Sequence, residues 1–182
     1  MPTTGPNFPT AATGNTATIG GGSVAWTSPT NIEVSDGVFA TAVLNASVSD
    51  DLIGTGFGFA ITGTDTINGI LLEVNYKSSV SGPIEANVRL LKAGTAAGTD
   101  KSTGASLPTV VTTVSYGSAA DLWGTTWTPA DVNNAGFGAA TVYNNVGALN
   151  RTVSVDFFRI TITSTAAGGG VKQASMMVMF LV

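Results

Sequence analysis

The sequence predicts an all-β protein, a β-sandwich of about eight strands with the jelly roll as its expected variant. Three observations predict it. Polar character is supplied mainly by Thr, Ser and Asn, with 23 Gly among 182 residues, a mixture that favours strands and tight turns. Alternating apolar and polar residues recur between turn signals. Only one stretch carries a good helix start, and it ends after about one turn.

One domain with an extended N-terminal arm is the predicted organisation. A chain of 182 residues is long enough for one full hydrophobic core and short for two. Residues 1–22 show no periodic apolar pattern and end in three glycines. We expect them to form an arm that becomes ordered on binding a partner, so that its deletion leaves a folded domain. Residues 23–182 are expected to form the single sandwich domain.

The first strand is expected at residues 38–44, directly after an Asp36-Gly37 turn. The second is expected at residues 55–61, where Phe57 and Phe59 share one face and small residues occupy the other. A face of small residues allows another backbone or subunit to come close. Phe57 and Phe59 are therefore interface candidates.

Two segments with regular alternation follow. Residues 70–76 and residues 84–90 alternate apolar and polar side chains, which is typical of strands with one solvated face. Because a short Ser-Gly-Pro turn separates them, two antiparallel neighbours, such as a hairpin, are the simplest interpretation. A loop is expected at residues 93–106, and a further strand at residues 110–116.

The predicted helix is a single turn that begins after Thr128. Thr128 is suited to be the N-cap, Pro129 to be the first helical residue, and Asp131 to accept backbone N–H bonds at the third position. Two asparagines and Gly136 then end the turn.

Three strands are expected to complete the chain. They lie at residues 137–143, 151–163 and 171–182. In the longest, the apolar pattern changes face at Phe157 and Phe158, which predicts a bulge or a central strand buried on both sides. The last is strongly apolar and could pair within its own chain or with a neighbour's sheet edge. Its interface candidates are Met177, Met179 and Phe180.

Composition excludes most familiar chemistry. The chain has no His and no Cys, which excludes disulfides, thiol nucleophiles, imidazole-based triads and zinc sites built on these residues. Its net charge is −4 and it has seven scattered Lys and Arg residues, so no nucleic-acid partner is expected. No signal peptide and no apolar run long enough to cross a membrane is visible, so we expect cytoplasmic synthesis and no membrane partner.

No enzyme activity, catalytic residue, cofactor or metal is expected. A calcium site at Asp50 and Asp51 stays open, because calcium needs only oxygen ligands. The low share of charged residues, 10%, and the mean hydropathy of +0.32 indicate apolar surface covered by copies of the chain. A homo-oligomer follows, with a trimer as one arrangement. Further interface candidates in the arm are Pro6, Phe8 and Pro9.

Four aromatic residues are candidates for stacking on a sugar, as aromatic faces do in glycan-binding modules. The favoured alternative is that they anchor the core or an interface, since each adjoins an expected turn or strand end. They are Trp26, Tyr116, Trp123 and Trp127.

Nine short segments stand in a fixed order between residues 26 and 163. They are WTSPTN at 26–31, SDGVFAT at 35–41, GFGF at 56–59, INGI at 67–70, YG at 116–117, DLWG at 121–124, WTPADVN at 127–133, FG at 137–138 and VD at 155–156. In order and spacing this set resembles a family of small β-rich structural proteins of tailed bacteriophages.

The resemblance implies a non-enzymatic virion protein of the decoration, head-fibre or tail type. The leading expectation is a capsid decoration (cement) protein, made in the host cytoplasm, that binds the outer capsid surface as a homo-oligomer with the major capsid protein or other virion proteins as partners. The alternative is a tail-fibre or adhesin module that recognises a host surface glycan through exposed aromatics. A third possibility is a carbohydrate-binding module with calcium.

Overall fold

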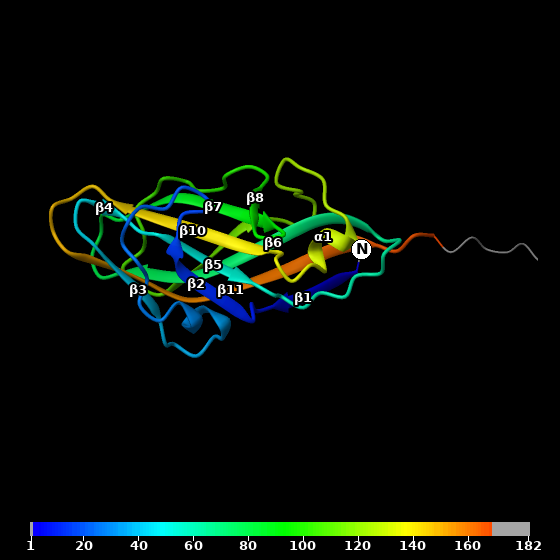
Figure 1. Cartoon of the computed structure of the whole chain (residues 1–182), viewed down its shortest axis with the longest axis horizontal. Coiled ribbons are helices and arrows are strands. Elements are labelled where there is room, and N and C mark those ends of the chain that lie inside the picture. Colours follow the sequence, from blue (N-terminus) through cyan, green and yellow to red (C-terminus); the bar gives the residue numbers. More distant parts are fainter. Residues whose placement is uncertain (1, 169–182) are drawn as a thin grey trace, which may run out of the picture.

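The computed structural model describes residues 2–168, which form a sandwich of two antiparallel sheets (Figure 1). The five-stranded sheet contains β1 (Thr3–Asn7), β3 (Ala40–Leu44), β6 (Thr66–Ser78), β9 (Thr112–Gly117) and β11 (Arg151–Thr165). The six-stranded sheet contains β2 (Ala11–Thr16), β4 (Ser47–Val48), β5 (Asp51–Thr55), β7 (Ile84–Lys92), β8 (Thr95–Ala97) and β10 (Gly138–Asn145). Two short helical segments are added, the 3-10 helix η1 (Pro29–Glu33) and α1 (Pro129–Val132).

The connections between strands are those of a jelly roll. In the five-stranded sheet the order is β1-β11-β6-β9, with β3 also paired to β11; in the other it is β2-β5-β10-β7-β8, with β4 also paired to β10. Between β5 and β11 every connection except β7 to β8 therefore crosses from one sheet to the other. This doubled Greek-key path confirms the predicted β-sandwich with jelly-roll connections.

Alternation on β6 correctly predicted which side chains face the core. Ile70, Leu72 and Val74 are fully buried between the sheets, whereas Glu73 and Lys77 on the other face are half-buried. The expectation that residues 70–76 and 84–90 are neighbouring strands was wrong. β6 pairs with β11 and β9, and β7 pairs with β10 and β8, because the turn between them crosses the sandwich.

The change of face within β11 is confirmed. β11 is a central strand with partners on both sides, and its pairing with β6 shifts register between Val155 and Phe157. Phe158 joins the core and Phe157 lies on the opposite face, where the ring of Phe8 packs edge-on at 5.7 Å between centroids. The Asp156 carboxylate at the bulge accepts the Gly37 N–H at 2.9 Å.

The predicted arm is built into the sandwich as edge strands. β1 pairs with β11 and β2 pairs with β5, so backbone hydrogen bonds order this segment although most of its side chains are exposed. Of its interface candidates, Pro6 is exposed, Phe8 is half-buried on Phe157, and Pro9 is buried. The lack of apolar periodicity therefore did not mean a free arm.

The strand predicted at residues 55–61 is not formed there, because β5 ends at Thr55. Gly56 and Gly58 have φ angles of +73° and +66°, a left-handed conformation that ends the extended backbone and that glycine adopts without strain. Phe57 and Phe59 are 3% and 5% exposed and pack with Phe137 in the core. They are core residues, so their prediction as interface residues was wrong.

The strands expected at residues 38–44, 110–116 and 137–143 are present as β3, β9 and β10. The loop expected at residues 93–106 contains the short strand β8. The strand at 171–182 and its candidates Met177, Met179 and Phe180 lie outside the described residues. Within residues 2–168, no helix is long and apolar enough to span a membrane.

Candidate binding site

Three of the four predicted sugar-stacking aromatics are structural anchors. Tyr116 is 4% exposed, Trp123 is fully buried and Trp127 is 6% exposed, and all three belong to the main core. The anchoring interpretation is therefore the correct one for them. Trp26 is also only 6% exposed and belongs to the same core, but it differs from these three in lining a pocket beside β2.

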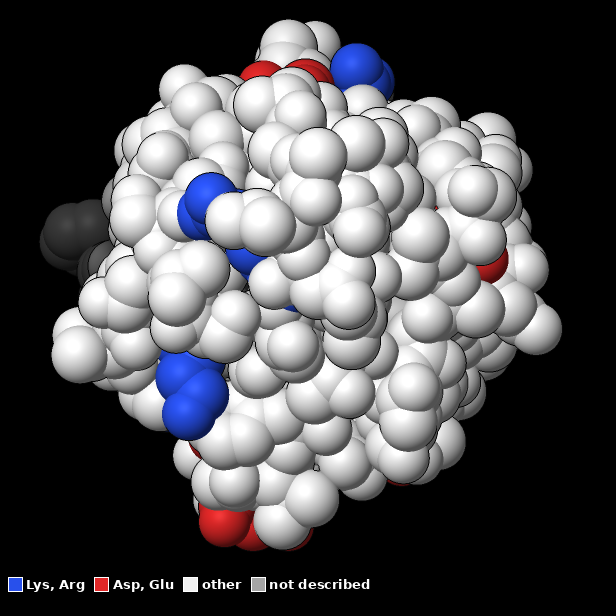
Figure 2. All heavy atoms as spheres, turned by 90° about the vertical axis from the view of Figure 1, so that its left-hand side faces the viewer, with Lys and Arg blue, Asp and Glu red and all other residues white. Residues whose placement is uncertain are grey.

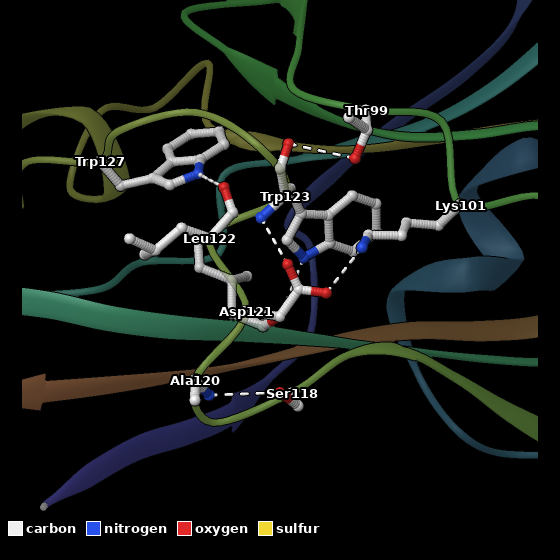
Figure 3. Close-up of polar contacts among 9 residues, drawn as sticks. Thr99, Lys101, Ser118, Ala120, Asp121, Leu122, Trp123 and Trp127 are labelled. Atoms are coloured by element: carbon white, nitrogen blue, oxygen red, sulfur yellow. Dashed lines mark hydrogen bonds and ion pairs between the residues drawn. The ribbon is translucent and has the colours of Figure 1, made fainter.

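In the 118–128 loop, Trp123 fastens the loop to the sandwich and Trp127 ties the loop to itself (Figure 3). The Trp123 indole N–H donates to the Ile70 carbonyl at 2.9 Å, and the Trp127 indole N–H donates to the Leu122 carbonyl at 3.0 Å. The Trp123 carbonyl accepts the Thr99 N–H at 2.7 Å, which joins this loop to the one after β8. Because both indole N–H groups are used internally, neither is left for a ligand.

Asp121 joins the same two loops electrostatically. Its Oδ1 accepts the Trp123 N–H and its Oδ2 lies 2.7 Å from Lys101 Nζ (Figure 3). The hydrogen bond from Lys101 holds the pKa of Asp121 below its ordinary value of 3.8 and outweighs the opposing effect of partial burial.

Tyr116 belongs to a buried polar cluster between the sheets. The hydroxyls of Tyr76 and Tyr116 both donate to Oε1 of Glu85. Oε2 of Glu85 accepts the N–H and the hydroxyl of Thr103, each at 3.2 Å. The pKa of both tyrosines is raised, mainly by their burial and further by the nearby charge of Glu85. With Glu85 only 3% exposed, the cluster cross-links the core rather than meeting a ligand.

In the acidic pair at residues 50 and 51, the carboxylate of Asp51 is engaged by the backbone of the fold. Asp51 is fully buried, and its Oδ2 accepts the Ile19 N–H at 2.6 Å. Burial raises the pKa of Asp51, and backbone N–H groups of residues 18, 19 and 21 partly offset this. Within residues 2–168, no three acidic side chains gather in a metal-binding group.

A pocket lies where β2 meets the segment before η1. Its volume is about 420 Å³. Trp26 forms part of its wall, and none of the lining residues is charged. They are Ala12, Thr13, Gly14, Asn15, Ala25, Trp26 and Pro29.

Trp26 is held firmly in this wall. Its backbone N–H donates to the Gly14 carbonyl at 2.8 Å, and its indole N–H donates to the Asp50 carbonyl at 2.9 Å. Tyr143 packs edge-on against its ring at 5.8 Å between centroids. Gly14 leaves room for the tryptophan, since a Cβ at that position would come within 2.4 Å of Trp26 Cβ. The pocket is thus formed before any ligand arrives.

Sequence reasoning singled out Trp26 but missed its polar neighbours. Thr13 and Asn15 belong to β2, in the stretch interpreted as an arm, and no motif marks them. Charged residues are few in the chain as a whole, 10% of the sequence. Figure 2 shows one end of the sandwich, where a few Lys, Arg, Asp and Glu side chains interrupt an otherwise uncharged face.

No family model matches the chain, and no curated protein matches it in sequence. A solved structure described as "CBM4 structure and function" is 14% identical, with 85% of this chain and 94% of that chain covered and a TM-score of 0.46. The N-terminal cellulose-binding domain of Cellulomonas fimi β-1,4-glucanase C is 11% identical, with 87% and 92% covered and a TM-score of 0.41. The second such domain of that enzyme is 13% identical, with 91% and 100% covered and a TM-score of 0.42.

These comparisons correct the prediction of a capsid decoration protein. The three structures just described are a CBM4 and two cellulose-binding domains, and none of the three is described as a capsid or other virion protein. The prediction of a capsid decoration function was therefore wrong. At TM-scores below 0.5 the likeness carries no argument about a ligand of this chain. The phage resemblance and the homo-oligomer stay predictions.

Proposed function

We propose that the chain is a non-catalytic module that binds a neutral carbohydrate in the pocket beside Trp26. The observation that carries this proposal is the combination of a fixed tryptophan, a hydroxyl and a side-chain amide around one uncharged pocket of about 420 Å³. That volume lies in the lower part of the range of small-molecule sites, about 300–1,000 Å³.

The chemistry of the lining suits a sugar. The apolar C–H groups of a pyranose can contact the small exposed part of Trp26, 6% of the residue, and the polar groups around it can bind the ring hydroxyls. Here the Thr13 hydroxyl and the Asn15 amide are exposed beside Trp26. An anionic ligand would find no cation among the lining residues, so a neutral one is favoured.

A binding role is favoured over hydrolysis by the same lining. Acid–base cleavage of a glycosidic bond ordinarily needs two carboxyl groups facing the bond. No Asp or Glu lines this pocket, and the nearby Asp51 carboxylate is buried against the backbone. A preformed wall also limits the entropy lost when the ligand binds.

A glycan array followed by calorimetric titration tests the proposal. We expect a neutral oligosaccharide to bind the full chain, and Thr13→Val and Asn15→Ala each to weaken it about fivefold, the equivalent of one hydrogen bond. Both side chains are exposed, so these variants should fold. Thr109→Val, at an exposed site outside the pocket lining, is the matched control.

Two outcomes would overturn it. One is an array with no neutral glycan bound. The other is binding that stays unchanged in both pocket variants, since the ligand would then lie elsewhere. Trp26→Ala is a poor substitute, because the buried ring supports the core through Tyr143.

A further inference from the structure

Sheet edges expose unpaired backbone groups, and proteins usually protect them. In the five-stranded sheet one edge is formed by β1 and β3. β1 carries Pro6, which has no N–H to offer, and its pairing with β11 is irregular between Thr4 and Asn7. A proline and a bulge are two of the known devices that discourage a further strand.

The segment leading into η1 covers other edge positions. Thr27 and Thr41 of β3 exchange two backbone hydrogen bonds, at 2.8 and 3.1 Å. The Gly14 carbonyl of β2 is taken by the Trp26 N–H. At the far edge of the six-stranded sheet, β8 has only three residues, and very short edge strands are themselves protective.

The β9 edge has none of these protections. Its six residues, TTVSYG, include no proline and no charge. Among the described residues, its backbone pairs with β6 and with no other strand. Thr113 and Ser115 are exposed on its outer face, and Val110 and Val111 just before it are 69% and 49% exposed.

We propose that β9 pairs with β9 of a second copy of this chain, antiparallel and across a two-fold axis. The two five-stranded sheets then become one continuous sheet. The second copy is favoured as occupant because the strand is uncharged, so it meets itself without repulsion although each chain carries a net charge of −4. A Thr–Ser pair is also a favourable cross-strand pair.

The register follows from the two faces of the sheet. Residues directly opposite each other share a face, and Val114 and Tyr116 face the core whereas Thr113 and Ser115 face outward. A two-fold axis perpendicular to the sheet keeps both cores on one side. Such an axis must therefore place one residue opposite its own copy. Centred on Val114, it pairs that valine with its own copy, Thr113 with Ser115, and the exposed Val111 with Gly117.

Charge exchange on the outer face tests this pairing. We expect the full chain to have twice the mass of one chain in size-exclusion chromatography with light scattering. Thr113→Lys/Ser115→Lys and Thr113→Glu/Ser115→Glu each place like charges opposite each other, so each variant should be monomeric. An equimolar mixture of the two should regain the double mass.

A matched control places the same charges on another edge strand. Thr3→Lys/Thr4→Lys adds the same charge on the exposed β1 strand and should keep the double mass. Circular dichroism checks that every variant is folded. A monomeric full chain overturns the proposal, whether residues 169–182 cover β9 or the edge stays open. Dimeric charge variants, or a mixture that stays monomeric, overturn it as well.

Discussion

Asn145 positions a whole loop from one buried side chain. It is 1% exposed, and its Nδ2 lies within 3.1 Å of the carbonyls of Leu44, Gly147 and Leu149, while its Oδ1 accepts the Gly147 N–H at 3.2 Å. The loop between β10 and β11 is thereby tied to the end of β3. No periodic pattern in the sequence marks this residue, because its tie to β3 depends on Leu44, 101 positions away.

Replacing Asn145 should therefore destabilise the fold. Asn145→Ala removes a donor from the carbonyl of the buried Leu44 and breaks the ties to Gly147 and Leu149, which costs about 1–3 kcal/mol of the free energy of unfolding. Urea denaturation followed by tryptophan fluorescence measures it. Asn150→Ala, at an exposed position in the same loop, should change the value by less than about 0.5 kcal/mol. Equal effects of the two variants would contradict this role.

The Lys101–Asp121 pair predicts a pH dependence. The pKa of Asp121 is lower in the folded chain than its ordinary value of 3.8, so the pair stabilises the fold above that value. This contribution disappears as the pH falls through the lower folded-state pKa. Asp121→Asn should thus be less stable than the wild type at pH 7, by less than about 1 kcal/mol because the pair is partly exposed. Thermal denaturation from pH 7 to pH 2 should show the gap closing at the acid end; a constant gap would refute it.

At the level of elements, the α1 cap is where sequence and structure agree most fully. The Thr128 hydroxyl accepts the Asp131 N–H at 3.2 Å, and the Asp131 carboxylate accepts the Thr128 N–H at 2.8 Å. The structure adds a contact that the sequence did not show, since Lys92 from β7 lies 3.1 Å from the same carboxylate. A local turn is thus joined to the six-stranded sheet.

Removing the cap should cost more than its short length suggests. Thr128→Ala should lower the free energy of unfolding by about 1 kcal/mol, because it also loosens the placement of Asp131 beside Lys92. Differential scanning calorimetry gives the shift. Thr126→Ala, an exposed threonine in the same loop, is the matched control, and a shift of the same size there would assign the effect to the loop in general.

Features that depend on one strand alone could be predicted from the sequence, whereas pairings between distant segments could not. Alternation in β6 and the face change in β11 report on each strand's own two surfaces, so both were readable from the sequence. Neighbours are set by connections that cross the sandwich, which is why β6 and β7 were wrongly paired. The pocket could not be predicted for a related reason. Thr13 and Asn15 become its lining residues only when the loop carrying Trp26 folds onto β2.

The whole molecule depends on its first residues more than their composition suggests. β1 and β2 add an edge strand to each sheet, the ring of Phe8 packs on Phe157, and Pro9 is buried where a Cβ on Gly54 would come within 3.0 Å of it. A segment with mostly exposed side chains thus closes one side of the fold.

Deleting residues 1–16 should therefore destabilise the chain rather than leave an unaffected domain. Less surface is exposed on unfolding when two strands are missing, so both the urea midpoint and the slope of the transition should fall. Deletion of Met1 alone is the control and should change neither. A truncated chain with the same midpoint as the full chain would show that the edge strands add nothing.

The antiparallel contact of β1 with the end of β11 also decides how the fold responds to a mechanical load. Thr3 lies opposite Thr163, the Ser164 N–H donates to the Pro2 carbonyl at 3.1 Å, and the chain enters and leaves at the same end of the sandwich (Figure 1). Tension applied at residues 2 and 168 would pull along the direction of these hydrogen bonds and load them one after another. Such unzipping needs less force than shearing, so β1 would peel away first and leave the central pairing of β11 with β6 intact.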